Sequence, residues 1–340
     1  MCAFSLAALL LVVVLFGYYK WKYQYWRKKK LPFLQPQIPF GNILNPITSK
    51  DCFGVTMARV YSEMKRNGWK HGGGYVFLSM YVLVDLNYIK NILTKDFHCF
   101  TDRGFFHNEK DDPISNNIFL MSGTNKWKRM RAKLTSIFSS GRMKHLFQTL
   151  VKCLPHLLSS LEADRVKDQP TNIKDTMSSF TMDVIGSCIL RQENVCHYLL
   201  LNFPNLAKSL GVCTIPKDVS EFLMGVVKDT VKYRELNNYS RPDFIQLLID
   251  LKNSGDALTV EEIAAQCFVF FLSGFDTSAT TQTFTLYERA KNQDIQERLR
   301  EEICTVLSHH DDRLTYDTIK HLTYMDQVVA GEFWYLVRKE

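Results

Sequence analysis

The feature that most limits the fold is the proline-free stretch Val260–Lys291. Thr259 and Glu262 lie at its start in the capping-box pattern, in which a Thr hydroxyl and a Glu carboxylate satisfy early helix N–H groups. The stretch predicts one helix of about 32 residues, roughly 48 Å long. Residues 263–272 are apolar on nearly all faces, and the polar Gln266 argues against a second membrane span. We therefore expect this helix inside the core of a large, mainly helical body.

A polar insert, Ser273–Ser278, interrupts this apolar helix. Gly274 costs about 1 kcal/mol in a helix interior, and a buried Asp276 costs more unless it is paired. The Thr277 hydroxyl can bond to the carbonyl four residues earlier and bend the helix. Two interpretations follow: a widened turn that binds a small polar ligand in a dry core and moves protons to it, or a structural kink with a paired aspartate. On the residues alone the kink is favoured.

A small sheet is expected near the start of the chain. After the glycines of residues 71–74, residues 75–85 are rich in β-formers and read as two short strands. A helical pattern precedes them from Asp51 to Asn67, and helical patterns predominate from Leu86 onward, with an irregular segment at 104–117. The predicted fold class is mainly α with a small β-sheet.

The N-terminus has the pattern of an uncleaved membrane anchor. Residues 3–19 form an uncharged run that would span roughly 25 Å as a helix. Aromatic residues close the run and six cations follow: Lys20, Lys22, Arg27, Lys28, Lys29 and Lys30. The alternative, a cleaved signal peptide, fits poorly because no basic segment precedes the run and no small-x-small site follows it. We predict a transmembrane anchor at 3–19 with the chain's body on the cytosolic side, then a basic stop-transfer and an extended, proline-rich hinge at 20–42.

Charge and cysteine usage exclude other classes. The chain carries 42 Lys and Arg against 35 Asp and Glu, a net +7, and six of the cations lie within residues 1–30, where there is no acid. The rest is nearly neutral, which disfavours a nucleic-acid binder. The nine cysteines are widely spread without a C-x-x-C pair, so neither a zinc site nor a disulfide framework fits. Free thiols in a reducing compartment are expected.

A second helix begins at Asn125 and carries many cations. Trp127 and Arg131 are four residues apart and share a face, where an indole N–H and a guanidinium could clamp a buried dianionic cofactor. The remaining cations would lie on other faces: Lys126, Lys128, Arg129 and Lys133. A solvated surface is the more common role for them, and a docking patch for an acidic electron-transfer protein is the alternative.

In chain order these features resemble the cytochromes P450, and within them the microsomal family-6 enzymes of insects. Residues 100–104 (FTDRG) are similar to the segment before the family's B–C loop, and Trp127-x-x-x-Arg131 matches the C-helix motif whose Trp and Arg hold haem propionates. The segment from Gly274 to Thr277 matches the I-helix motif. The resemblance covers about residues 1–328 and implies a cytochrome P450 domain at 43–329, incomplete in this chain.

The resemblance implies a haem-thiolate monooxygenase of the endoplasmic reticulum membrane, with its catalytic body on the cytosolic side. It would oxidise an apolar small molecule with O2 and electrons that NADPH–cytochrome P450 reductase supplies. Gly274 would lie beside the haem, and Asp276 and Thr277 would relay protons. Expected substrate contacts are Phe105, Phe106, Ile118, Phe119, Phe268, Phe271 and Phe275; ordinary core packing is the alternative for each.

The chain departs from the family in three places. Ser273 replaces an Ala or Gly, and the stretch between Ile189 and Asn202 is shorter than the family's E–F region above the substrate. The tail at 330–340 diverges: Glu332 begins an E-x-x-R pattern, but position 335 is Tyr. The loop F-x-x-G-x-R-x-C-x-G, which supplies the axial thiolate, is not among the 340 residues.

We therefore expect no axial cysteine, no metal ligand and no catalysis in the chain as written, with loose haem retention at most. Two alternatives stay open. One is an incomplete gene product whose full locus encodes an active enzyme. The other is a non-catalytic, membrane-anchored binding protein that pairs with the reductase or with an intact cytochrome P450.

Overall fold

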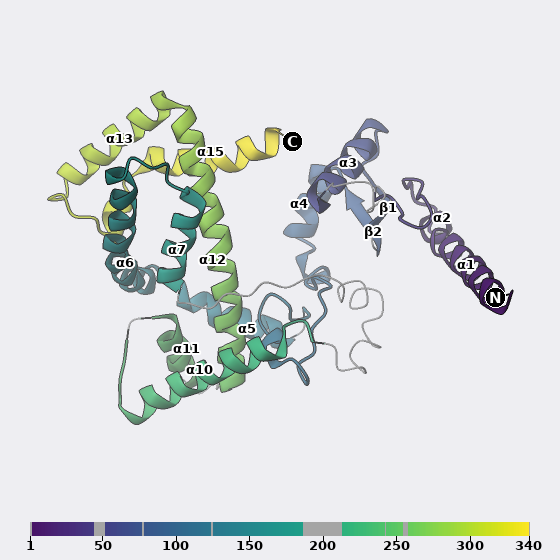
Figure 1. The fold of residues 1–340 in the computed structure, drawn as a ribbon, viewed down its shortest axis with the longest axis horizontal. Helices are drawn as coiled ribbons and strands as arrows, with labels where there is room; N and C mark the ends of the chain where they lie inside the picture. The colour runs from purple at the N-terminus through teal and green to yellow at the C-terminus, as the bar shows by residue number, and fades with distance from the viewer. Residues whose placement is uncertain are drawn as a thin grey trace. The chain divides into compact units, whose positions relative to one another are not determined.

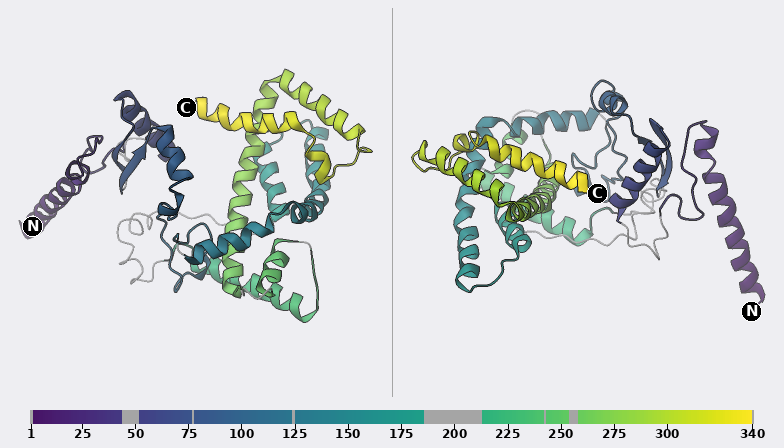
Figure 2. Two further views of the ribbon diagram at one scale, coloured as in Figure 1. Left: turned by 180° about the vertical axis from the view of Figure 1, so that it is seen from behind. Right: turned by 90° about the horizontal axis from the view of Figure 1, so that it is seen from above.

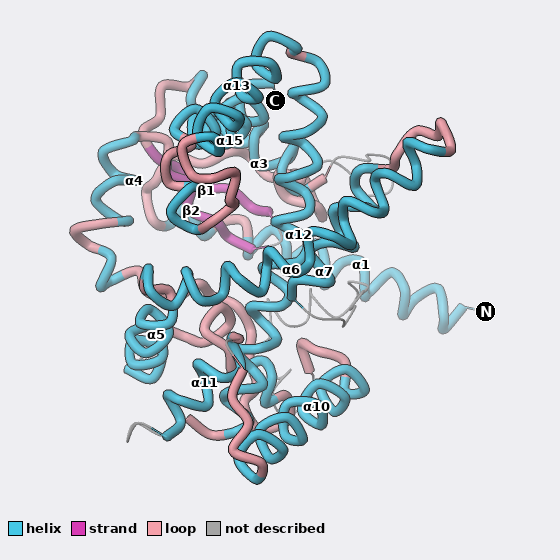
Figure 3. Tube along the Cα trace, turned by 90° about the vertical axis from the view of Figure 1, so that its left-hand side faces the viewer, coloured by secondary structure: helices cyan, strands magenta, loops and turns pink. Residues whose placement is uncertain are grey.

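The computed structural model describes residues 2–43, 52–76, 78–123, 125–185, 213–241, 243–253 and 258–339 (Figure 1). These residues form two compact units, one ending at Thr101 and the other beginning at Asp102. Each unit is described by itself. Helices predominate among the described residues, as predicted (Figure 3).

The first unit contains a two-stranded antiparallel sheet with short helices around it. Its elements are α1 (Cys2–Lys22), α2 (Tyr25–Lys28), α3 (Phe53–Arg66), β1 (His71–Val76), β2 (Leu78–Leu83), α4 (Leu86–Leu93) and the 3-10 helix η1 (Phe97–Cys99). His71 pairs with Leu83 and Val76 with Leu78, so the two predicted strands are confirmed. β1 begins earlier than predicted, because the glycines at 72–74 belong to the strand.

Close packing on β1 explains why these glycines form strand. A Cβ atom at Gly73 would lie 2.3 Å from the Trp26 ring, so only glycine admits the indole there. The Trp26 indole N–H donates to the Gly74 carbonyl at 3.1 Å. The start of the proline-rich segment lies along β1: the Gly73 N–H donates to the Pro32 carbonyl at 2.8 Å, and the Leu34 N–H to the Gly73 carbonyl at 3.0 Å. The segment then turns at residues 38–40, where Gln37 pairs with Gly41.

The membrane-spanning prediction for residues 3–19 is not confirmed. Within the described part of the chain, we found no helix with both the length and the apolar character needed to cross a membrane. The segment is helical, within α1, and the side chains of Leu9–Phe16 are 46–65% exposed. The anchor remains a prediction.

The second unit is built around the long helix α12 (Val260–Lys291) (Figure 2). Its other helices among the described residues are η2 (Pro113–Ser115), α5 (Asn125–Ile137), α6 (Ser140–Val166), α7 (Ile173–Ile185), α10 (Lys217–Leu236), α11 (Phe244–Asn253), α13 (Gln293–Ser308), α14 (Tyr316–Ile319) and α15 (Thr323–Lys339). α12 contacts α7, α10, α11, α13, α15 and η2. The predicted extent of the helix and both capping-box hydrogen bonds of Thr259 and Glu262 are confirmed.

The main core lies against the first half of α12. Ile263 and Ala264 are fully buried there, with Leu134 of α5, Leu248 of α11 and Val227 of α10 in the same cluster. These side chains approach from three helices, which explains why residues 263–272 are apolar on nearly all faces.

Two predicted departures fall mostly outside the described structure. The stretch between Ile189 and Asn202 lies wholly outside the described residues. The divergent tail continues α15 as far as Lys339, but the side chains from residue 332 onward are outside the described set.

Candidate functional site

One peptide group connects the predicted site elements. Ile118 lies in the loop before α5, and its carbonyl accepts hydrogen bonds from the Trp127 indole N–H at 3.1 Å and from an Arg103 guanidinium N–H at 3.2 Å. The Ile118 backbone N–H donates to the Gln266 side-chain oxygen at 3.0 Å. The loop, α5 and α12 therefore meet at Ile118.

Two guanidinium groups flank the Trp127 indole. The Cζ atom of Arg131 lies 5.7 Å from the ring centroid and that of Arg103 lies 5.9 Å away, both within cation–π range. Trp127 is 3% exposed, while both arginines are exposed. The prediction that Trp127 and Arg131 share a face is confirmed. Two accessible guanidiniums can bind carboxylates with paired hydrogen bonds, which suits a dianionic ligand.

Sequence reasoning missed Arg103. It belongs to the FTDRG segment, which was noted for its resemblance but not for its cation. Lys126 also differs from expectation: it forms an ion pair with Glu109 and lies 3.8 Å from Glu262, so it connects the loop and α12. Lys128 and Arg129 are exposed, as a solvated surface requires.

The predicted substrate-contact residues divide into two groups. Phe105 and Phe119 stack with ring centroids 5.1 Å apart and are 39% and 47% exposed. Phe271 and Phe275 stack on α12 with centroids 6.2 Å apart. Phe106 and Phe268 are buried, and Phe268 belongs to the main core, so core packing describes these two. The stacked pairs and Ile118, which is half-buried, are the better candidates for ligand contact.

The polar insert of α12 differs from its prediction in one respect. The Thr277 hydroxyl donates to the Ser273 carbonyl, as expected, while the helix stays continuous past Gly274. Asp276 and Thr277 are exposed, so the expectation of a dry core around them is wrong for the described structure. The burial of α12 is concentrated in its first half. In the described part of the chain, Asp276 has no hydrogen bond or ion pair, which removes the paired-aspartate interpretation there.

Burial disfavours the thiolate form of two described cysteines. Six described cysteines form no disulfide: Cys52, Cys99, Cys153, Cys213, Cys267 and Cys304. Burial raises the pKa of the Cys267 thiol to about 12 and raises that of Cys213 less strongly. A thiolate ligand needs the opposite shift, which nearby cations or a helix N-terminus produce. The described residues also contain no cluster of three or more His, Cys, Asp or Glu that could hold a metal ion.

Cys267 should therefore resist alkylation in the folded chain. With a pKa of about 12, its thiol stays protonated at pH 8, whereas the exposed Cys52 and Cys99 are accessible to reagent. We expect iodoacetamide, read by mass spectrometry, to label Cys267 at least about tenfold more slowly than Cys52, and at a similar rate after unfolding. Equal rates in the folded chain would contradict the assigned burial.

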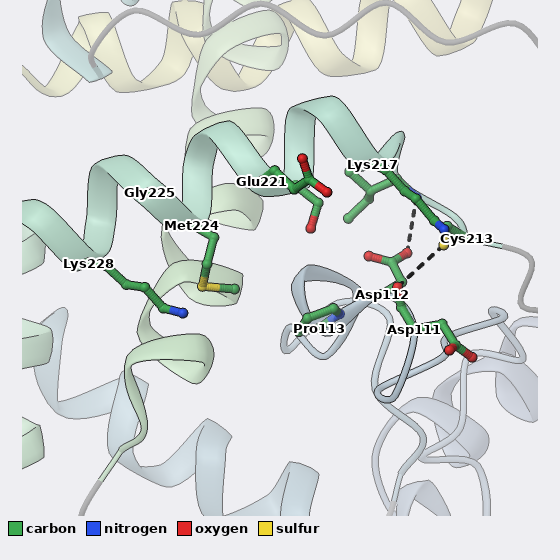
Figure 4. A pocket seen from close by; sticks show the side chains of 11 residues that line it. Asp111, Asp112, Pro113, Cys213, Lys217, Glu221, Met224, Gly225 and Lys228 are labelled. Carbon is green, nitrogen blue, oxygen red and sulfur yellow. Dashed lines mark hydrogen bonds between the residues drawn. The ribbon is translucent and has the colours of Figure 1, made fainter.

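A groove of about 530 Å³ lies between η2 and α10 (Figure 4). Asp112 lies at one end and is 1% exposed. Its carboxylate accepts the backbone N–H groups of Thr214 at 2.9 Å, Ile215 at 3.0 Å and Ser115 at 3.3 Å. Burial raises the pKa of Asp112 although these three hydrogen bonds oppose the shift. Asp112 thus joins the loop to the segment before α10.

The chain matches known proteins along most of its length. The family model described as Cytochrome P450 matches residues 74–197 and 193–330. The chain belongs to the cytochrome P450 family. "Probable cytochrome P450 6a20" of Drosophila melanogaster is 37% identical, with 90% of this chain and 68% of the relative covered. "Cytochrome P450 6a9" of the same fly is 37% identical, at 95% and 71% coverage, and "Cytochrome P450 6A1" of Musca domestica is 34% identical, at 91% and 67%.

The comparisons support the predicted insect family-6 character of this cytochrome P450. They also concern the stretch between Ile189 and Asn202, which is predicted to be shorter than the family's E–F region. The match to 6a9 extends over 361 aligned positions, more than the 340 residues of this chain, so the relative has residues within the aligned region that this chain lacks. The two ranges matched by the family model meet at 193–197, inside the stretch predicted to be short.

Cytochromes P450 contain haem and act as monooxygenases, so the family implies both for this chain. The described residues fit the propionate groups of a haem. Arg103 and Arg131 are exposed cations beside the buried Trp127, a suitable arrangement for two propionates. On the iron side, burial raises the pKa of the Cys213 and Cys267 thiols, which does not suit an axial thiolate.

Proposed function

We propose that these residues form the propionate-binding and oxygen-side part of a haem monooxygenase that oxidises apolar small molecules. The observation that supports this most is the pair of guanidiniums around Trp127, hydrogen-bonded to the loop that carries Phe119. In this proposal Arg131 and Arg103 would hold the haem propionates beside Trp127, whose indole N–H is bound to the Ile118 carbonyl, and Gly274 would let α12 approach the macrocycle. The haem, when bound through a thiolate, supplies oxygen activation.

The chain's own residues would supply positioning and proton movement. Asp276 is accessible to water and can exchange protons with it, while Thr277 is held by its bond to the Ser273 carbonyl. The stacked pairs Phe105–Phe119 and Phe271–Phe275 offer aromatic surface to an apolar substrate.

We further propose that the 340 residues by themselves do not run the reaction. The support is chemical: burial raises the pKa of the Cys213 and Cys267 thiols, and none of the nine cysteines lies in an F-x-x-G-x-R-x-C-x-G sequence. A non-catalytic role is the second candidate. Exposed Lys128 and Arg129 on α5 favour binding to an acidic partner such as the reductase.

Haem titration tests the proposed function. Replacing Arg131 by Gln removes one charge-assisted contact, worth about 1.5–3 kcal/mol, so the haem Kd should rise at least about tenfold. Arg129→Gln is the matched control, because Arg129 is exposed on the same helix two positions away, and it should change the Kd less than about twofold. An equal effect of both variants, measured by absorbance titration, would contradict the proposed clamp.

We propose that α1 attaches the chain to the endoplasmic reticulum membrane with the body on the cytosolic side. The support is the apolar run itself and the exposure of Leu9–Phe16, since an exposed apolar surface of that length favours a lipid environment over water. Deleting residues 2–22 should move most of the expressed protein out of the alkali-resistant membrane fraction. Unchanged membrane retention after that deletion would contradict the proposed attachment.

A further inference from the structure

The buried Gln266 is a candidate for a role that the family motifs do not give it. It lies on α12, two turns before Gly274, and its side chain is fully buried among core residues. A buried amide costs free energy unless both its oxygen and its nitrogen find partners. The Gln266 oxygen accepts the Ile118 N–H at 3.0 Å, and its amide nitrogen donates to the Asn116 carbonyl at 3.4 Å.

Both partners of Gln266 belong to one short segment of the loop, 148 and 150 positions away in the chain. Within that segment, Asn117 organises the following turn: its side-chain oxygen accepts the N–H groups of Phe119 at 3.0 Å and Leu120 at 3.1 Å. The turn therefore has its own local hydrogen bonds, and Gln266 fixes its position relative to α12.

The position of Ile118 determines the position of two functional groups. Its carbonyl accepts the Trp127 indole N–H and an Arg103 guanidinium N–H, and the next residue is Phe119, which stacks on Phe105. Without Gln266, the Ile118 N–H would be left without its acceptor, and the peptide would rotate or move toward water. The clamp and the exposed aromatic pair would both move with it.

We propose that Gln266 is a positioning residue that fixes the Ile118 peptide and thereby aligns the Trp127–Arg103 clamp and the Phe105–Phe119 pair. The expected effect of Gln266 on haem binding rests on the proposed function, whereas its effect on the position of the loop does not. Gln266 itself touches no reacting atom.

The test compares Gln266→Met with Gln282→Met in the full chain. Methionine matches glutamine in length and makes neither hydrogen bond. Gln282 lies on the same helix, and its buried side-chain oxygen has no hydrogen-bond partner among the described residues, so its loss should be neutral. In Gln266→Met, hydrogen exchange at the Ile118 amide should accelerate by about fivefold or more, the factor for one neutral hydrogen bond. The haem Kd should rise as well. Neither should change in Gln282→Met.

A second variant keeps the test decisive if the methionine disturbs folding. A protonated glutamic acid has one acceptor and one donor, like glutamine, whereas a carboxylate has no donor. Burial raises the pKa of a glutamate, so at about pH 5 the protonated side chain of Gln266→Glu can make both hydrogen bonds and should give near wild-type protection of Ile118, compared with wild type at the same pH. Unchanged protection in Gln266→Met, or no recovery of Gln266→Glu at about pH 5, would overturn the proposal. If the wild-type chain binds no haem, the proposed function fails while the exchange result still stands.

Discussion

Replacing Asp112 by Ala should lower the free energy of unfolding by about 3–5 kcal/mol, among the largest effects of any single change in this chain. The carboxylate accepts three backbone N–H groups; when it is removed, those of Thr214 and Ile215 lose this acceptor, while that of Ser115 keeps its bond to the Asp112 backbone carbonyl. Each buried donor left unsatisfied costs about 1–3 kcal/mol. Urea denaturation followed by circular dichroism measures the change.

Asp111→Ala is the matched control for Asp112. Asp111 is the preceding residue, but it is exposed, and within the described part of the chain its carboxylate accepts one side-chain hydrogen bond, from Asn108. Its loss should cost less than about 1 kcal/mol. Equal destabilisation by the two variants would contradict the role of Asp112 in joining the loop to the segment before α10.

The pH dependence of the Asp112 effect follows from its raised pKa. Because the folded-state pKa lies above the unfolded value, the folded state binds the proton more tightly, and the contribution of Asp112 to stability falls as pH rises through the folded pKa. The difference in unfolding free energy between wild type and Asp112→Ala should therefore be larger near pH 4 than near pH 7. A difference that grows with rising pH would contradict the burial of this carboxyl.

Replacing Arg234 by Met should lower the free energy of unfolding by about 3 kcal/mol. Arg234 is 8% exposed and holds Asp243 with two hydrogen bonds of 2.8 and 2.6 Å, which join α10 to the start of α11. The hydrogen bonds to Asp243 raise the pKa of Arg234, so it stays charged throughout the accessible pH range. Removing the arginine leaves a partly buried carboxylate with less compensation. Urea denaturation again gives the measurement.

Two further variants define the Arg234 effect. Arg234→Met combined with Asp243→Leu removes both charges, and stability should recover by more than half, since apolar pairs replace buried ion pairs well. Lys252→Met removes a more exposed ion pair between the same two helices, 2.7 Å from Glu235, and should cost less than about 1 kcal/mol. No recovery in the double variant would show that the charge left on Asp243 is not the cause.

Local patterns in the sequence predicted much of this structure. The capping box at Thr259 and the apolar run behind it set the start and burial of α12, because both depend on residues within a few turns. The i,i+4 spacing of Trp127 and Arg131 predicted their shared face for the same reason. The two strands followed from β-forming residues, although packing of Trp26 on Gly73 extended β1 beyond the pattern.

The contacts that assemble the candidate site could not be predicted in this way. Gln266 reaches Ile118 across 148 positions, and Asp112 reaches Ile215 across 103. Such pairs depend on how distant helices pack, and no local period encodes them. The exposure of Asp276 was mispredicted because the apolar pattern describes the helix and not the elements that cover each of its faces.

The most direct test is the absorbance spectrum of the purified, haem-loaded chain after anaerobic reduction and addition of carbon monoxide. We predict haem binding that depends on Arg131, without the red-shifted Soret band of a thiolate-ligated ferrous carbonyl. A stoichiometric thiolate-type band would contradict the proposal that the cysteines of this chain do not ligate the iron.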